Sequence, residues 1–77
     1  MHINYDSQAD AIYIRLRQGN VDDTLNIGKY IHVDVDKEGM PLGLEVLSAK
    51  HILAQEELTS ITVNMTRMPE LGQAISA

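Results

Sequence analysis

Cysteine is absent from this chain of 77 residues. The chain can therefore form no disulfide, no thiolate metal site and no thiol nucleophile. An absence of cysteine also fits a reducing compartment. Small domains often gain stability from disulfides, metals or oligomerisation, and the first of these is excluded here.

Basic residues are scarce. Six Lys and Arg stand against eleven Asp and Glu, so the formal net charge is −5. Proteins bind phosphate backbones by neutralising them with Lys and Arg, and this composition does so poorly. Nucleic acid is therefore not expected as a partner, and a basic protein would suit the charge better.

Long apolar runs are also missing. No stretch approaches the roughly 20 apolar residues of a membrane helix. The first residues, 1–6, lack a basic region followed by an apolar run, so they do not resemble a signal peptide. These features predict a cytoplasmic protein with no membrane partner.

The short length indicates a single domain with a thin core. A folded chain of this size removes only about 62% of its extended surface from water. We expect one domain over residues 1–66, a C-terminal tail or arm over residues 67–77, and a homo-oligomer that compensates for the thin core.

Apolar and polar residues alternate with a period of two along most of the chain, which predicts strands buried on one face. The clearest runs lie near residues 2–6, 11–17, 31–36, 42–46 and 61–66, with a weaker third run that Gly28 interrupts by a bulge or bend. Ser48 has the properties of an N-cap for a helix of about three turns over residues 49–58. The expected fold is α+β: an antiparallel β-meander of four to five strands with one short helix packed on one face.

The alternation also predicts how the strands pair, because a shift of one residue would turn every side chain to the other face. In the hairpin around Gly39, inward residues pair as Val35 with Leu42, Val33 with Leu44 and Ile31 with Val46. His32 should then face Glu45, and Asp34 should face Gly43. The same reasoning pairs Ile3 with Ile14 and Tyr5 with Ile12.

Three ordered blocks resemble the DUF2283 family of small bacterial and archaeal proteins of unknown function. The first is Tyr5-Asp6 followed by residues 9–14, the second covers residues 33–39, and the third covers residues 42–49. Position 35 is more often aromatic in the family, so Val35 is a departure. The resemblance spans residues 3–65 and implies a β-meander followed by a helix, with no established activity. Relatives encoded beside small toxin-like proteins imply an antitoxin or binding role.

The expected outward face contains one candidate ligand site. His32, Asp34 and cross-strand Glu45 have the composition of a His/carboxylate site for a divalent ion, because neighbours on one face of a strand lie about 6.6 Å apart. The alternative is a solvated sheet face with a His–Glu pair worth under about 1 kcal/mol.

Tyr13 and Arg15, with Arg17, should project on the same outward face. An aromatic, guanidinium and carboxylate cluster is typical of a protein-interface hot spot, and also of polar side chains that only shield a sheet. Both interpretations stay open.

Catalysis finds little support in the sequence. No serine lies in a Gly-x-Ser-x-Gly context, no glycine run forms a phosphate loop, and Asp6 and Asp10 fit the two ends of a turn better than a metal loop. We therefore expect a non-enzymatic binding module without a cofactor, and the resemblance implies an antitoxin-like role. The alternative is a metal- or small-ligand-binding protein that uses His32, Asp34 and Glu45.

Overall fold

A computed structural model of the chain describes residues 1–54 and 58–66. The described residues form five strands and one short helix. The strands are β1 (His2–Asp6), β2 (Ala11–Arg15), β3 (Asp23–Ile27), β4 (Ile31–Val35) and β5 (Pro41–Val46), and the helix is α1 (Ala49–Ile52). The predicted antiparallel sheet with one short helix is confirmed.

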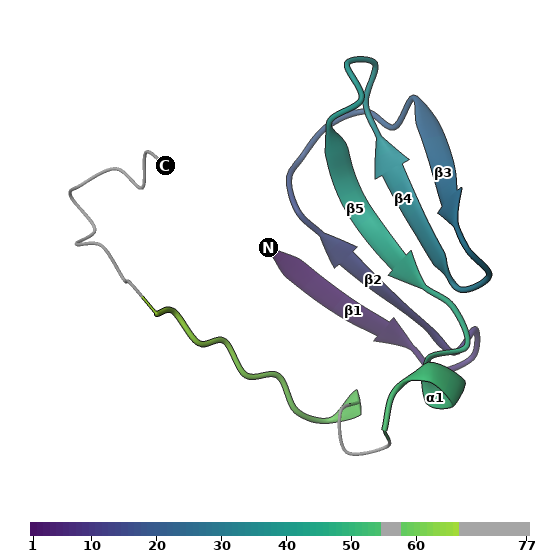
Figure 1. Ribbon diagram of the computed structural model, residues 1–77, viewed down its shortest axis with the longest axis vertical. Helices are drawn as coiled ribbons and strands as arrows, with labels where there is room; N and C mark the ends of the chain where they lie inside the picture. The colour runs from purple at the N-terminus through teal and green to yellow at the C-terminus, as the bar shows by residue number, and fades with distance from the viewer. Residues whose placement is uncertain (55–57, 67–77) are drawn as a thin grey trace.

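The five strands form one sheet in the order β1-β2-β5-β4-β3, so the order is sequential everywhere except at one point (Figure 1). The β1–β2 hairpin and the β3-β4-β5 meander meet where β2 pairs antiparallel with β5. The connection between β2 and β3 makes this possible, because it crosses the end of the sheet. Along it, the backbone N–H of Leu16 donates to the carbonyl of Leu42 (2.8 Å), and that of Asp22 donates to the carbonyl of Val35 (2.8 Å).

The predicted register is confirmed at most positions. Ile3 pairs with Ile14 and Tyr5 with Ile12. In the β4–β5 hairpin, the pairs that match the prediction are Ile31–Val46, His32–Glu45, Val33–Leu44 and Asp34–Gly43.

One predicted pair is wrong. Val35 lies opposite Pro41 rather than Leu42, because the register shifts between Asp34 and Val35. The cause lies in the loop that follows, where the carboxylate Oδ1 of Asp36 accepts hydrogen bonds from the backbone N–H groups of Glu38 (3.0 Å) and Met40 (2.9 Å). The loop closes through these hydrogen bonds to Asp36, and the pairing of the two strands is shifted by one residue.

The strand predicted over residues 61–66 is also wrong. Residues 61–65 lie outside every strand of the described sheet. The fifth strand is instead β3, which ends one residue before Gly28. Gly28 has a φ of +69° in the turn between β3 and β4, so it forms a hairpin turn rather than a bulge within a strand.

The helix is shorter than predicted. It covers only four residues and ends where Leu53 becomes extended. Ser48 makes no side-chain capping bond, because its own backbone is left-handed (φ 51°). Residues 55–57 of the predicted helix, and the predicted tail over residues 67–77, lie outside the described residues.

The core of the described residues is thin, as the chain length predicts. The buried apolar side chains are Ala11, Val35, Leu42 and Ala49, and no large side chain is fully buried. The burial of Val35 (7% exposed) agrees with its place in a core strand despite the departure from the family pattern. The sheet thus has one polar and one apolar face, and the apolar face is only partly covered.

Candidate functional site

The polar face of the sheet holds a hydrogen-bonded cluster that crosses four strands. Tyr13 on β2 donates its hydroxyl to Oδ2 of Asp34 on β4 (2.7 Å). Thr24 on β3 donates its hydroxyl to the other oxygen, Oδ1, of the same carboxylate (2.7 Å). The strand between β2 and β4 is β5, and there Gly43 pairs with both Arg15 and Asp34. The carboxylate of Asp34 is therefore held from both sides.

Gly43 makes the long reach of Tyr13 possible. A methyl group at this position would lie 2.5 Å from Cζ and 2.9 Å from Cε1 of the Tyr13 ring, and would contact its hydroxyl more closely still. The ring thus lies directly on the backbone of β5, and Gly43 is buried beneath it. Glycine within a strand often marks such a close approach.

The hydrogen bond to Asp34 is the main cause that raises the pKa of Tyr13 above its ordinary value of 10.0. Partial burial and the negative charge of Asp34 add to it, while the positive charge of Arg15 opposes it. The phenol is protonated at neutral pH, as an ordinary tyrosine is, and Tyr13 donates a hydrogen bond to Asp34 there.

His32 and Glu45 form a second pair beside this cluster. Nδ1 of His32 lies 3.4 Å from Oε1 of Glu45, and both side chains are partly exposed. The predicted position of this pair on the polar face is confirmed, because the two residues are cross-strand neighbours. Arg15 extends along the same face and donates from Nη1 to Oε1 of Gln18 at 3.4 Å.

The structure does not bring His32, Asp34 and Glu45 together as the alternative metal site would require. Within the described ranges, no three His, Asp or Glu side chains come close enough together to hold a metal ion. The physical reason is the position of Asp34, whose two oxygens already accept from Tyr13 and Thr24. Thr24 lies directly opposite Asp34, whereas Tyr13 lies opposite Glu45 and reaches Asp34 diagonally across β5.

Asp10 has a role that the sequence did not indicate. Asp6 begins the β1–β2 turn as predicted, since its Oδ1 accepts from the backbone N–H of Gln8 (3.0 Å). Asp10 ends that turn with a left-handed backbone (φ 53°) and accepts from the Tyr5 hydroxyl at 2.8 Å. It also accepts from the backbone N–H of Lys50 at 3.2 Å, while its carbonyl accepts from Ala49 at 2.9 Å.

Asp10 therefore fastens the first turn of α1 to the end of the sheet. No signal in the sequence marks this contact, because the partners lie 40 residues apart.

The chain matches a protein-family model. The family model of DUF2283, a protein of unknown function, matches residues 2–50. The chain belongs to the DUF2283 family. No curated protein and no solved structure matches the chain.

The DUF2283 match covers the sheet, the turn at Asp10 and the first residues of α1. It ends before residues 51–65, which were included in the resemblance noted from the sequence. Among the described residues no helix is long and apolar enough to cross a membrane.

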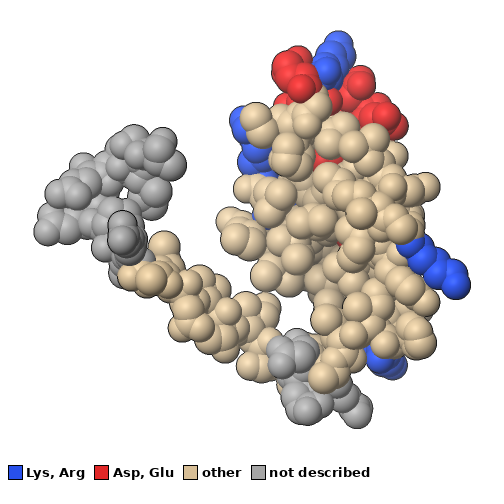
Figure 2. Space-filling view, in the orientation of Figure 1, with Lys and Arg blue, Asp and Glu red and all other residues tan. Residues whose placement is uncertain are grey.

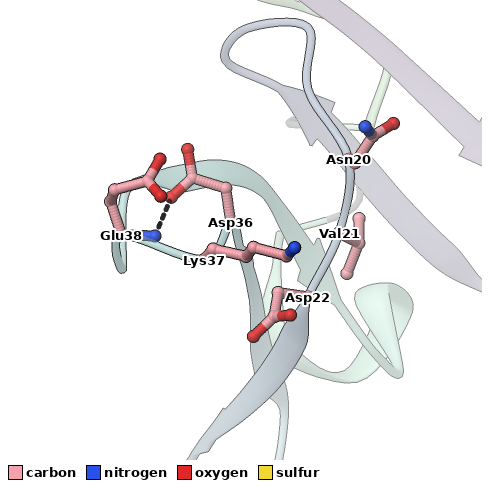
Figure 3. A pocket seen from close by; sticks show the side chains of 6 residues that line it. All are labelled: Asn20, Val21, Asp22, Asp36, Lys37 and Glu38. Carbon is pink, nitrogen blue, oxygen red and sulfur yellow. Dashed lines mark hydrogen bonds between the residues drawn. The ribbon is translucent and has the colours of Figure 1, made fainter.

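Acidic side chains of this DUF2283 protein gather at the end of the sheet that holds the β4–β5 loop (Figure 2). Asp22, Asp36 and Glu38 line a shallow pocket there, together with Lys37 and the Asn20–Val21 segment (Figure 3). The hydrogen bond from the Glu38 backbone to Asp36 shapes one wall. Asp36 thus accepts the hydrogen bonds that close the β4–β5 loop. The pocket is lined with negative charge but does not form a preformed ligand site.

The apolar face of the sheet leaves many of its side chains exposed to solvent. Its edge residues are the most exposed, with Ile3 at 39%, Leu25 at 46% and Ile27 at 58%. Ile12, Ile14, Val33 and Leu44 in its middle are only half-buried. Over β1 and β2 the face borders a hollow of about 330 Å³, which Leu58 and Ile61 line from the opposite side.

Proposed function

We propose that this protein is a non-enzymatic binding module that acts as a homo-oligomer, and that the apolar face of its sheet is the binding surface. The observation that carries the proposal is the exposure of that face along both edges, at Ile3, Leu25 and Ile27. Contiguous apolar surface of this kind is typical of interfaces rather than of monomer surfaces.

The polar face supports binding rather than catalysis. Asp34 already accepts two hydroxyl groups, and Tyr13 keeps its proton at neutral pH. In an assembly that buries the apolar face, the polar side chains stay outward, and there they can contact a second protein. These are the five residues selected from the sequence: Tyr13, Arg15, His32, Asp34 and Glu45.

The net charge of −5 favours a basic protein as that second partner, and we propose an antitoxin-like role towards it. Binding to the product of an adjacent gene, measured by calorimetry at low and moderate salt, tests this part. Contact through the polar face predicts weaker binding for Glu45→Ala and Tyr13→Ala. Binding that neither change affects would place the contact elsewhere.

The main proposal is tested with two aspartate substitutions on the same strand. Leu25→Asp places a charge on the apolar face, whereas Asn26→Asp places the same charge on the polar face of β3. Light scattering after size exclusion should show an oligomer for the wild type and for Asn26→Asp. Leu25→Asp should weaken association at least tenfold, because a buried, unpaired carboxylate costs more than about 1.4 kcal/mol.

Circular dichroism serves as the control for folding, since Leu25 is half exposed in the single chain and its change should leave the sheet intact. A wild type that is monomeric at every concentration would overturn the proposal. Equal effects of the two substitutions would also count against the apolar face.

A further inference from the structure

Residues 61–65 have the sequence of a strand but lie outside the sheet. They read Ile-Thr-Val-Asn-Met, an alternation typical of a strand with one buried face. In the structure, Ile61 is 68% exposed, Val63 75% and Met65 57%. Figure 1 shows this segment running away from the sheet on the side of β1. Its apolar side chains therefore lack the cover that their pattern calls for.

A surface that could cover them lies on the same chain. The hollow beside β1 and β2 is lined on the sheet side by Ile3, Tyr5, Ile12 and Ile14. Leu58 and Ile61 line it from the other side, at the beginning of the segment. The chain then continues away from its own sheet, so that residues 63–65 are carried beyond it (Figure 1).

The charge and length of the segment fit an apolar sheet face. Residues 58–66 carry no Lys, Arg, Asp or Glu, and the segment is uncharged throughout in Figure 2. It can therefore approach another copy of this acidic chain without like-charge repulsion. Five extended residues span about 17 Å, the length of a five-residue strand such as β1.

We propose that residues 61–65 of one copy seat on the apolar face of a second copy, at the hollow beside β1 and β2, and that the second copy returns the same contact. This inference rests on the proposed function and names what occupies part of the interface. In a two-fold arrangement, the segment of each copy covers the apolar face of the other. The same contact therefore forms twice, as an isologous interface requires. Exchange of a terminal segment between identical chains is a low-cost route to such a dimer.

Disulfide trapping tests the exchange directly, because the natural chain contains no cysteine. One chain carries Ile3→Cys and another carries Val63→Cys, and the two are mixed under mild oxidation. The exchange predicts a covalent heterodimer of the two chains. A control mixture replaces Ile3→Cys with Asn4→Cys, which lies on the same strand but on the polar face. The control should yield at least tenfold less heterodimer.

The double variant Ile3→Cys/Val63→Cys separates exchange from folding back within one chain. Exchange predicts that it forms covalent dimers, whereas a segment that folds onto its own sheet gives a cross-linked monomer and no heterodimer in the mixture. A cross-linked monomer, or equal yields from test and control mixtures, would overturn the inference.

Val63→Asp and Asn64→Asp give an independent measurement without cysteine. Seating of Val63 predicts association at least tenfold weaker for Val63→Asp in sedimentation experiments, and no change for Asn64→Asp. If Leu25→Asp dissociates the oligomer and Val63→Asp does not, the proposed function stands and the exchange is wrong. If the wild type is a monomer, both fall.

Discussion

At the scale of single residues, the polar face depends on a missing side chain. Gly43 has no Cβ, so the Tyr13 ring can cross β5 and reach Asp34 two strands away. Thr24 completes the arrangement from β3. These four residues hold the side chains of the polar face in place and tie together strands from both halves of the sheet.

Replacing Gly43 with alanine should destabilise the fold by about 1–3 kcal/mol, because the new methyl group displaces the Tyr13 ring and breaks its hydrogen bond to Asp34. Chemical denaturation measures the loss. In a Tyr13→Ala background the same change should cost much less, since the ring is no longer there. Strictly additive effects would show that the ring does not rest on Gly43.

Tyr13 also gives the protein a predicted response to alkaline pH. Its pKa is raised in the folded state, chiefly by the hydrogen bond to Asp34. The folded state holds this proton more tightly than the unfolded state, so the contribution to stability is complete below the ordinary pKa of 10.0. It is lost as the pH rises through the higher folded value.

The free energy of unfolding of the wild type should therefore fall more steeply above about pH 10 than that of Tyr13→Phe. Tyr5, whose pKa is raised chiefly by its hydrogen bond to Asp10, is present in both proteins and does not affect the difference. Parallel curves for the two proteins would contradict the assigned hydrogen bond.

At the scale of secondary-structure elements, most strand pairs could be predicted from the sequence. The strand predicted over residues 61–66 was wrong, and the predicted helix was too long. Strict alternation in β4 and β5 was sufficient to pair His32 with Glu45. β3 was harder to predict, because Asp23–Ile27 is exposed along its whole length and has a weak pattern. Residues 61–65 have the better pattern, yet a strand also needs a partner, and within the single described chain they have none in the sheet.

The candidate site shows the same limit. The register predicted from the sequence places Tyr13, His32, Asp34 and Glu45 on one face of the sheet, because cross-strand position follows from register. The preference of Asp34 for Tyr13 over His32 depends on the ring that rests on Gly43, a packing detail that alternation does not contain.

Ser48 illustrates how backbone conformation overrides a cap. Its left-handed φ of 51° carries an energetic cost for a residue with a Cβ, and its side chain makes no capping bond in return. Ser48→Gly should therefore raise the thermal midpoint, by the equivalent of about 0.5–1 kcal/mol. Ser48→Ala should be nearly neutral. A loss of stability on Ser48→Gly would restore the predicted capping role.

At the scale of the whole molecule, the described chain is a sheet of one layer. Domains normally bury a sheet face against a second layer, and here the short α1 lies at the end of the sheet (Figure 1). Among the described residues, the buried apolar side chains are Ala11, Val35, Leu42 and Ala49. A second copy would supply the missing layer, and stability would then depend on association.

The dependence of unfolding on protein concentration tests this claim most directly. If association supplies the second layer, the denaturation midpoint of the wild type should rise with each tenfold increase in concentration, and native sedimentation should give a multiple of 8.6 kDa. A sharp unfolding transition at one midpoint across all concentrations, with a native mass of 8.6 kDa, would contradict it.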